Sequence, residues 1–376
     1  MRRTVAGVMA RRRARLAVAA LTTALLSAAC TSTSPPAVPE PVWSAAPSPS
    51  LSAPAPTPAP SQAGAETLTL AFGGDVHFTG RTARLLRDPG TVFGAFAAPL
   101  RAADVAVVNL ETAVTTRGTP EPKEFHFRTP ASAFTALTAA GIDIASLGNN
   151  HALDYGRVGL ADSLAAARSA GVPVIGAGAT ADEAYAAHVV TVRGVRVAVL
   201  AMSQIHTLAE AWAPTATRSG VAMSHDRGRA VQAVKDARAQ ADVVVVFMHW
   251  GVESSNCPKA EMTSLAKALA AAGANIITGT HAHVPLAGGM IGNTYVHYGA
   301  GNFVWYVGSS DTLLLTLTVS AVPGGGPDHT RVVKADVLPG VISSTGQPKL
   351  VTGSAASAVK ARLAGAQRCS GLKPGP

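Results

Sequence analysis

Residues 67–80 read TLTLAFGGDVHFTG, and this stretch joins a predicted strand to chemically active side chains. Its first six residues are an alternating run of strand-forming residues that ends at two glycines. Asp75 and His77 follow, and residues two apart in an extended chain point the same way. A carboxylate oxygen and an imidazole nitrogen directed at one point suit a divalent metal ion, although Asp and His are also common in ordinary loops.

Four later predicted strands end in the same kind of residue. The residues concerned are Glu111 after strand 104–109, Asn150 and His151 after strand 142–147, His249 after strand 242–248, and His281 and His283 after strand 274–278. Open α/β sheets carry their functional sites at the carboxyl ends of their strands, so these side chains are expected to converge. A turn or cap would account for Asn109, whereas no turn requires His151. Asp154 is assigned the structural role of capping a helix that begins near Arg157.

Together these strand ends provide nitrogen and oxygen donors and no thiolate. The expected ligands are Asp75, His77, Glu111, Asn150, His249, His281 and His283. Seven ligands exceed what one ion takes, whereas two ions about 3.5–4 Å apart can share a bridging carboxylate. Glu111 is the predicted bridge. Mn, Fe and Zn all fit such donors, so the sequence predicts two divalent metal ions without identifying them.

The rest of the chain predicts a layered α/β fold. Strands are expected at 67–73, 104–109, 142–147, 173–176, 187–193, 195–202, 242–248, 274–278, 294–299, 312–320 and 330–337, and helices at 80–87, 131–140, 157–170, 225–240 and 259–272. Strands that alternate with helices favour a layered core, and hairpin-like pairs within 187–202 and 312–337 add antiparallel strands. We expect one domain over 66–340, built of mixed sheets covered by helices, and a C-terminal tail over 341–376.

The first 65 residues have the features of a targeting segment and a tether. Residues 1–29 contain six arginines, no acidic residue and an apolar run too short to span a bilayer comfortably, as secretory signals do. Small residues before Cys30 resemble a bacterial lipobox, which would place a lipid anchor on Cys30 at the outer face of the cell membrane. An ordinary signal peptide cut near Ala29 and plain secretion are the alternative. Residues 30–65 contain ten prolines and are predicted to be a disordered tether, or a plain tail if no lipid is attached.

The formal net charge of +9 does not indicate a nucleic-acid partner. Six arginines lie in the predicted signal segment, and no run of Lys or Arg remains in the rest of the chain. A nucleic-acid-binding surface normally needs such a concentration of cations, so we expect no nucleic acid among the partners.

Two cysteines remain besides Cys30, namely Cys257 and Cys369. In an oxidising compartment a disulfide is their simplest use, and free buried thiols are the less favoured alternative. The bond would tie the C-terminal tail to a loop in the last third of the chain. Closing a loop of this length stabilises a fold by about 4–5 kcal/mol in the chain-entropy account.

In chain order, these motifs resemble those of the CapA family, the poly-γ-glutamate capsule synthesis proteins within the calcineurin-like metallophosphoesterases. The resemblance covers about residues 67–305 and rests on Gly-Asp-x-His, Asn-x-Glu, Asn-Asn-His-x-x-Asp-x-Gly, His-Trp-Gly, Gly-x-His-x-His and Gly-Asn-Phe. It implies a four-layer metallophosphatase-like core of two mixed β-sheets flanked by helices. Classical phosphoesterases bridge their metals with the Asp of a Gly-Asp-x-x-Asp motif. Here Asn109-Leu110-Glu111 takes that place, as it does in the CapA branch.

The resemblance also implies roles for individual residues. Asp75, His77 and His283 would hold one metal, Asn150, His249 and His281 would hold the other, and Glu111 would bridge them. His151 would lie over the metals and contact the leaving group or the charge that develops on an oxyanion, with a bridging hydroxide as nucleophile. Arg128 is a candidate for binding an anionic substrate group, with loop packing as its alternative. Asn302 is a candidate site-lining residue, with a turn as its alternative.

Two functions of different classes follow. The first is an envelope-anchored, metal-dependent hydrolase of the CapA type that acts on an anionic polymer such as poly-γ-glutamate, or on a phosphoester, in capsule synthesis, release or export. The second is a non-catalytic accessory protein that binds metal and polymer and assembles with membrane proteins of a polymer synthase. His151, which metal binding alone does not require, favours the enzyme. The altered bridge at Glu111 favours the accessory protein.

Overall fold

The structure, a computed structural model, describes residues 64–306 and 311–376. Every described residue belongs to a single compact unit. The predicted signal segment, the predicted lipidation site Cys30 and nearly all of the predicted tether lie outside the described residues. Within the part that is described, no helix combines the length and the apolar character needed to cross a bilayer.

The larger of the two main sheets has eight strands in the order β18-β17-β16-β1-β2-β5-β6, with β15 also paired to β1. Their bounds are β1 Glu66–Val76, β2 Val105–Leu110, β5 Ile144–Ser146, β6 Val174–Ile175, β15 Asn302–Val304, β16 Asp311–Ala321, β17 Thr330–Ile342 and β18 Pro348–Leu350. Strands β1, β2, β5 and β6 run parallel, whereas β16, β17 and β18 are antiparallel. The predicted 312–320 and 330–337 pair is therefore confirmed as antiparallel.

The second main sheet has six strands in the order β13-β14-β12-β11-β9-β8. Their bounds are β8 His188–Val192, β9 Val195–Ser203, β11 Val243–Trp250, β12 Ile276–His281, β13 Gly288–Ile291 and β14 Thr294–His297. Its four central strands are parallel, and β8 and β13 pair antiparallel at the two edges. Two small sheets pair β3 Ala113–Val114 with β4 Arg128–Thr129, and β7 Ala177–Gly178 with β10 Gly220–Val221.

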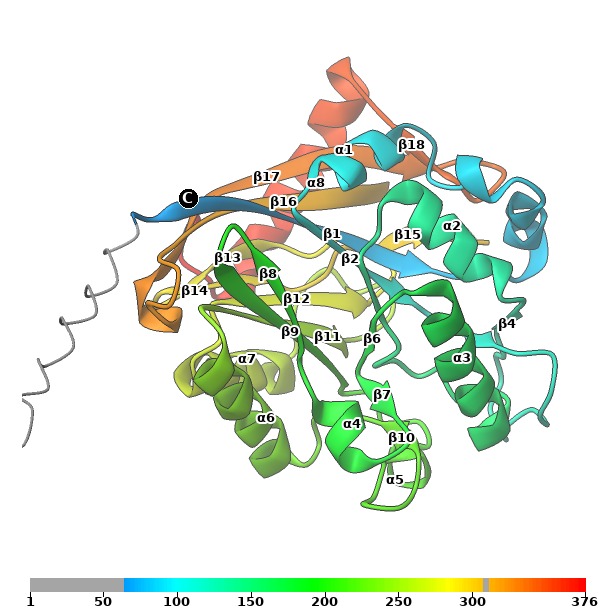
Figure 1. The fold of residues 1–376 in the computed structure, drawn as a ribbon. Coiled ribbons are helices and arrows are strands. Elements are labelled where there is room, and N and C mark those ends of the chain that lie inside the picture. The colour runs from blue at the N-terminus through cyan, green and yellow to red at the C-terminus, as the bar shows by residue number, and fades with distance from the viewer. Residues whose placement is uncertain (1–63, 307–310) are drawn as a thin grey trace, which may run out of the picture. The chain divides into compact units, whose positions relative to one another are not determined.

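The two main sheets pack face to face between two layers of helices (Figure 1). Alternation along each strand produces this layering, because successive side chains point to opposite faces. In β11, for example, Val243 and Val245 join the apolar cluster between the sheets, while Val244 and Val246 pack against helices α6 and α7. On the outer side of the eight-stranded sheet, the cluster includes residues of α1, α2 and α3. The predicted mixed α/β architecture is thus confirmed.

The five predicted helical segments are all helical, and four further helices, α1, α4, α5 and α8, were not predicted. The bounds of the α-helices are α1 Ala97–Ala102, α2 Ser132–Ala140, α3 Gly156–Ala170, α4 Ala181–Tyr185, α5 Ala209–Trp212, α6 Arg227–Gln240, α7 Ala260–Ala272 and α8 Gly353–Ser370. The segment 80–87 is a 3₁₀ helix, and further 3₁₀ turns occupy Pro89–Thr91, Gly94–Phe96 and Pro327–His329. Residues 341–376, expected as a tail, include β18 and the long α8, which lies against β17. Helix α8 was not predicted because small residues dominate its sequence and few of its side chains are buried, so it has no clear apolar periodicity.

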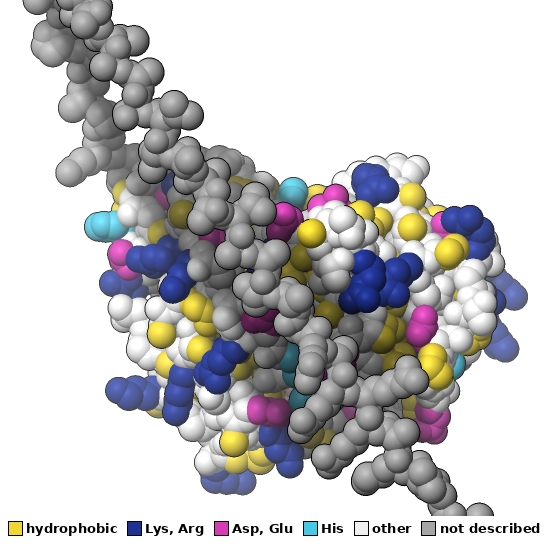
Figure 2. All heavy atoms as spheres, turned by 90° about the horizontal axis from the view of Figure 1, so that it is seen from below, with side chains coloured by type: hydrophobic (Ala, Val, Ile, Leu, Met, Phe, Trp, Pro, Cys, Tyr) yellow, Lys and Arg dark blue, Asp and Glu magenta, His cyan; other side chains and the backbone are white. Residues whose placement is uncertain are grey.

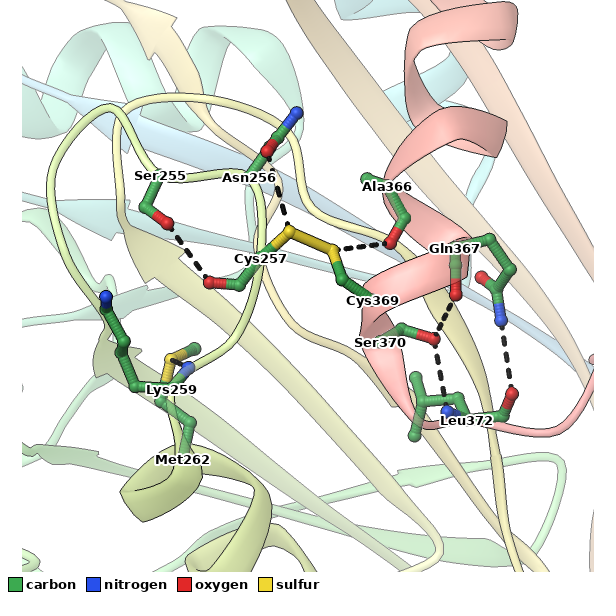
Figure 3. The surroundings of a disulfide bond; sticks show 10 residues. All are labelled: Ser255, Asn256, Cys257, Lys259, Met262, Ala366, Gln367, Cys369, Ser370 and Leu372. Carbon is green, nitrogen blue, oxygen red and sulfur yellow. Dashed lines mark hydrogen bonds between the residues drawn. A yellow bond between two sulfur atoms is a disulfide. The ribbon is translucent and has the colours of Figure 1, made fainter.

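Cys257 and Cys369 form a disulfide (Figure 3). Cys257 lies in the loop that joins β11 to α7, and Cys369 lies in the last turn of α8. Because β11 belongs to the six-stranded sheet and α8 lies against β17 of the eight-stranded sheet, the bond connects the two halves of the sandwich covalently.

Charged side chains are spread over the described part of the face in Figure 2, where Lys and Arg groups alternate with apolar and neutral surface. Most ion pairs on this domain are exposed, as in Arg229–Asp182 and Lys334–Asp336. Exposed pairs of this kind contribute little to stability. Most of the buried ionisable groups gather instead where the carboxyl ends of strands from both sheets meet, and Asp242 and His297 are buried elsewhere.

Candidate metal centre

Six of the seven predicted ligands meet where the carboxyl ends of strands from both main sheets approach one another. Asp75, Glu111 and Asn150 come from β1, from the end of β2 and from the loop after β5. His249, His281 and His283 come from β11, β12 and the turn after β12. The closest contacts are His249 Nε2 to Asn150 Oδ1 at 2.7 Å, His281 Nδ1 to His249 Nε2 at 3.1 Å, His283 Nδ1 to Asp75 Oδ2 at 3.2 Å and His249 Nε2 to Glu111 Oε1 at 3.5 Å.

The backbone brings these side chains together through register and through close approach of strands. Asp75 lies opposite Asn109 in the parallel pair β1–β2, and its backbone N–H donates to the carbonyl of Gly301 at 2.9 Å. That approach requires glycine at position 74, where a Cβ atom would lie 1.8 Å from the Gly301 oxygen. The glycine pair that ended the predicted strand is therefore inside β1, which continues to Val76.

Two of the histidines adopt an unusual backbone conformation. His281 has φ of 90° and His283 has φ of 58°, a region that non-glycine residues seldom occupy. Such residues carry strain of about 1–3 kcal/mol each and concentrate at functional sites. Here the turn directs both imidazoles back toward the eight-stranded sheet, where the backbone N–H of His281 donates to Asp75 Oδ2 at 3.1 Å.

Two groups of donor atoms are compact enough to hold a metal ion within the described residues. One consists of Glu111, His281 and His283, and the other of Asp75, Glu111 and His249. In each group, one donor atom per residue lies within 4.8 Å of the others. Glu111 belongs to both groups. The grouping pairs Asp75 with His249 and His281 with His283, whereas the family resemblance pairs Asp75 with His283 and His249 with His281.

Glu111 has the features of a carboxylate that needs a cation. It is completely buried, and its Oε1 has no hydrogen-bond partner among the described residues. Burial raises the pKa of Glu111 well above its usual range, and the nearby charge of Asp75 raises it further. An ionised carboxylate in this position is unfavourable until positive charge is supplied. The donors present therefore fit a divalent metal.

His249 and His281 are held in the neutral form that binds metals. Burial lowers the pKa of His281 to about 3 and that of His249 well below its usual value, and neighbouring imidazoles add to the effect. Burial opposes ionisation of Asp75, but hydrogen bonds from His283 and Asn109 bring its pKa below the ordinary value. Neutral imidazole and ionised carboxylate are the protonation states that metal binding requires.

Asn109 connects the ligands rather than forming a turn. It is a buried residue of β2, and its Nδ2 lies 2.7 Å from Asp75 Oδ1, 3.2 Å from Glu111 Oε2 and 3.2 Å from His249 Nδ1. Asn149 orients the Asn109 amide by donating to its Oδ1 at 2.9 Å. The turn interpretation of Asn109 is therefore replaced by a position at the centre of the site.

His77 stands apart from the two metal-competent groups, in an aromatic enclosure. Its ring stacks on Phe127 with centroids 4.4 Å apart and meets the edges of Trp305 and Tyr306. Nδ1 accepts a hydrogen bond from the backbone N–H of Thr79 at 3.1 Å. The backbone N–H of Tyr306 lies 3.4 Å from Nε2, so both ring nitrogens of His77 already face backbone donors.

His151 faces Glu111 and is held from behind by Asp154. Its Nε2 lies 3.8 Å from Glu111 Oε1, and its Nδ1 lies 2.6 Å from Asp154 Oδ2. We assign the ring proton to Nδ1 because a carboxylate can only accept. Burial lowers the pKa of His151 to about 4. The ring also stacks on Phe127 with centroids 4.0 Å apart.

The expected role of Asp154 as a helix cap is wrong. Helix α3 begins at Gly156 without any side-chain cap, and the Asp154 carboxylate accepts from Phe127 N and Lys123 Nζ as well as from His151. The carboxylate binds three donors from two loops, and these contacts direct it toward His151 and away from the helix. The spacing of His151 and Asp154, three residues apart in one loop, is the sequence signal that could have linked them.

Asn302 and Arg128 differ in their relation to the site. Asn302 lies on β15 and contacts His283 twice, with Oδ1 2.9 Å from Nδ1 and with Nδ2 donating to the His283 carbonyl at 3.1 Å. Arg128 lies on β4 with an exposed side chain, and its guanidinium carbon is 4.2 Å from the ring centroid of Tyr155. Its contact is the packing alternative that the sequence left open.

Comparisons with known proteins extend these observations. A family model described as bacterial capsule synthesis protein PGA_cap matches residues 69–306. The capsule biosynthesis protein CapA of Bacillus anthracis is 30% identical over 295 residues, covering 76% of this chain and 70% of that protein. A probable polyglutamine synthesis accessory protein of Mycobacterium tuberculosis is 31% identical over 213 residues, covering 54% of this chain and 56% of the relative. Among solved structures, a putative 5'-nucleotidase from Staphylococcus aureus aligns with a TM-score of 0.46 at 15% identity, covering 80% of this chain and 58% of the other.

Proposed function

We propose a function for this chain on the basis that it belongs to the bacterial capsule synthesis protein family PGA_cap. In this proposal it is an envelope-anchored protein with a dinuclear metal centre. The centre hydrolyses a bond in an anionic polymer or in its phosphorylated precursor. Poly-γ-glutamate is the polymer that this family suggests. The predicted signal segment and Cys30 support location at the outer face of the cell membrane.

One observation carries the metal proposal: the buried Oε1 of Glu111, which has no hydrogen-bond partner and belongs to both groups of metal-competent donors. Asp75, Asn150, His249, His281 and His283 would hold two divalent ions together with Glu111, and His77 would complete the set by turning one ring nitrogen away from its backbone donor. Bound ions would supply a water of lowered pKa and positive charge that stabilises a developing oxyanion.

The chain's own residues would orient the reacting groups. Asp154 fixes the ring of His151 so that its Nε2 faces the site, where it can hydrogen-bond with the leaving group or the attacked centre. Phe127, stacked between the rings of His77 and His151, keeps the two imidazoles parallel and apart. Asn109 and Asn302 hold the carboxylate and imidazole donors in place from the side away from solvent.

A second candidate function is a non-catalytic accessory protein in polymer synthesis. The name of the mycobacterial relative, which includes the words synthesis accessory protein, favours it. In that case the same centre would bind metal and polymer carboxylates, and the protein would act by assembly with membrane proteins of the synthase.

The decisive experiment measures bound metal by elemental analysis and then turnover of generic phosphoesters and of poly-γ-glutamate. The proposal expects about two ions per chain and turnover that falls roughly 10²–10⁴-fold in His151→Ala, because proton transfer by a positioned side chain contributes that much. Metal content should be unchanged in that variant. Bound metal with no turnover of any substrate would support the accessory function, and well-folded protein that takes up no metal would overturn both.

A further inference from the structure

Lys123 is a buried cation beside the site that the proposed chemistry does not yet use. It lies in the loop between β3 and β4, and its side chain is 6% exposed. Nζ donates to Asp154 Oδ1 at 2.6 Å and to the backbone carbonyl oxygen of Asn150. The same ammonium lies 3.2 Å from Nδ1 of His151 and 5.1 Å from the ring centroid of Trp212.

These contacts join the residues on either side of the candidate catalytic histidine in its loop. Asn150 precedes His151, Asp154 follows it, and Lys123 contacts both. On Asp154 the lysine uses Oδ1, which leaves Oδ2 for His151 Nδ1. On Asn150 it uses the backbone carbonyl, which leaves the side-chain oxygen for His249 Nε2 at 2.7 Å. One ammonium group therefore fixes two residues without occupying the atoms they use at the site.

Stability alone is a poor explanation for this arrangement. Removing an ammonium and a carboxylate from water carries a desolvation penalty that their attraction often fails to recover, so buried pairs are weak stabilisers. Burial accordingly lowers the pKa of Lys123 despite the adjacent Asp154. Its surroundings are also specific, because the loop that carries Lys123 supplies Phe127, whose ring stacks on His151 and whose N–H donates to Asp154 Oδ2 at 2.5 Å.

We propose that Lys123 is a positioning residue, which holds Asn150 and the His151–Asp154 pair in the orientation that the site requires. The inference rests on the proposed function in so far as His151 acts on a substrate. The placement of the His151 ring by Lys123 is, however, a property of the metal-free protein and can be measured there.

The first test compares Lys123→Met with Arg196→Met. Arg196 pairs with Asp242, which is completely buried like Asp154, but this pair lies at the amino ends of β9 and β11, away from the site. In metal-free protein labelled with ¹⁵N-histidine, the Nδ1 proton of His151 is identified by its loss in His151→Gln. Lys123→Met should broaden or remove this signal and Arg196→Met should keep it. An unchanged signal in Lys123→Met would overturn the proposal.

The second test uses chemical rescue, which a general loss of stability would not show. In the metal-loaded protein, Lys123→Ala should lower kcat about 10–100-fold, as loss of a hydrogen-bond partner of a metal ligand typically does, with little change in KM. Added ethylammonium should restore part of kcat in Lys123→Ala and none in Arg196→Ala. Equal losses in the two variants, or no rescue, would count against positioning. Because the NMR signal needs neither metal nor turnover, it decides the role of Lys123 even if the proposed function fails.

Discussion

The two main sheets contribute different chemistry to the same site. The eight-stranded sheet supplies the oxygen donors Asp75, Glu111 and Asn150, whereas the six-stranded sheet supplies only the imidazoles of His249, His281 and His283. The backbone differs too, because the non-glycine residues with positive φ at the site are two of these histidines. Neither sheet alone presents a complete ligand set, so the centre exists only where the sheets are packed together.

Substitution of Glu111, the carboxylate shared by both donor groups, is the strongest test of this difference between the two sheets. Glu111→Gln removes the negative charge that belongs to both donor groups while keeping the side-chain shape. We expect loss of the paired metal content and a loss of turnover larger than the roughly 100-fold typical of residues that only support a ligand. Elemental analysis and isothermal titration with Mn²⁺ check this. Two ions per chain retained in the variant would show that Glu111 is not a ligand.

Removing the disulfide tests how much the packing of the two sheets against each other depends on a covalent bond. Cys257→Ser combined with Cys369→Ser should lower the free energy of unfolding by about 4–5 kcal/mol on the chain-entropy account, since the bond closes a loop of 112 residues. Guanidinium unfolding measures the change, and reduction of the wild-type bond should reproduce it. An unchanged midpoint in both would mean that packing alone joins the sheets.

Asn302 provides a test of the contact between the two sheets, because this residue of the eight-stranded sheet orients an imidazole of the six-stranded sheet. Asn302→Ala should weaken metal binding about 10–100-fold by releasing His283. Titration with Mn²⁺ followed by calorimetry provides the measurement. Asn293→Ala, which changes an exposed asparagine in the turn between β13 and β14, is the matched control and should bind metal like wild type. Equal affinities in the two variants would contradict the role of Asn302.

The smallest expected effect is the pH dependence of the metal-free protein. Folding raises the pKa of Glu111, so its favourable contribution is complete below the unfolded value of about 4.3 and is lost as pH rises toward the folded value. The melting temperature of metal-free wild type should therefore fall relative to that of Glu111→Gln as pH increases above this point. Nε2 of His249 and of His151 lie 3.5 and 3.8 Å from Glu111 Oε1, so the difference between the two proteins reports the carboxylate together with its effect on these imidazoles. Parallel melting curves across pH would show that the carboxylate is already compensated.

The convergence of the candidate ligands could be predicted from sequence because these residues obey a simple rule. Each of them lies at or just after the carboxyl end of a strand, and parallel strands bring those ends to one edge. The alternation of apolar residues placed these strands to within a few residues. The same reasoning placed α7, whose end at Gly273 has the left-handed conformation expected of a helix stop.

The supporting residues could not be predicted in this way. Lys123 and Phe127 lie in an irregular loop, and no periodic pattern fixes where such a loop travels. Asp154 precedes a helix, so local propensity favoured a cap until tertiary contacts with His151 and Lys123 took its oxygens. Asn109 looked like a turn former because asparagine usually is one, and only the register of β1 against β2 shows that it faces Asp75.

Because Gly74 has no side chain, the backbone of β1 can approach the backbone that leads into β15 directly. The next residue after Gly301 on β15 is Asn302, whose amide holds His283. One additional carbon at position 74 would collide with the Gly301 carbonyl and push β15 outward. Gly74→Ala adds only one methyl group. Its main consequence would nevertheless be the displacement of the candidate ligand His283, through Asn302, and not a local loss of packing.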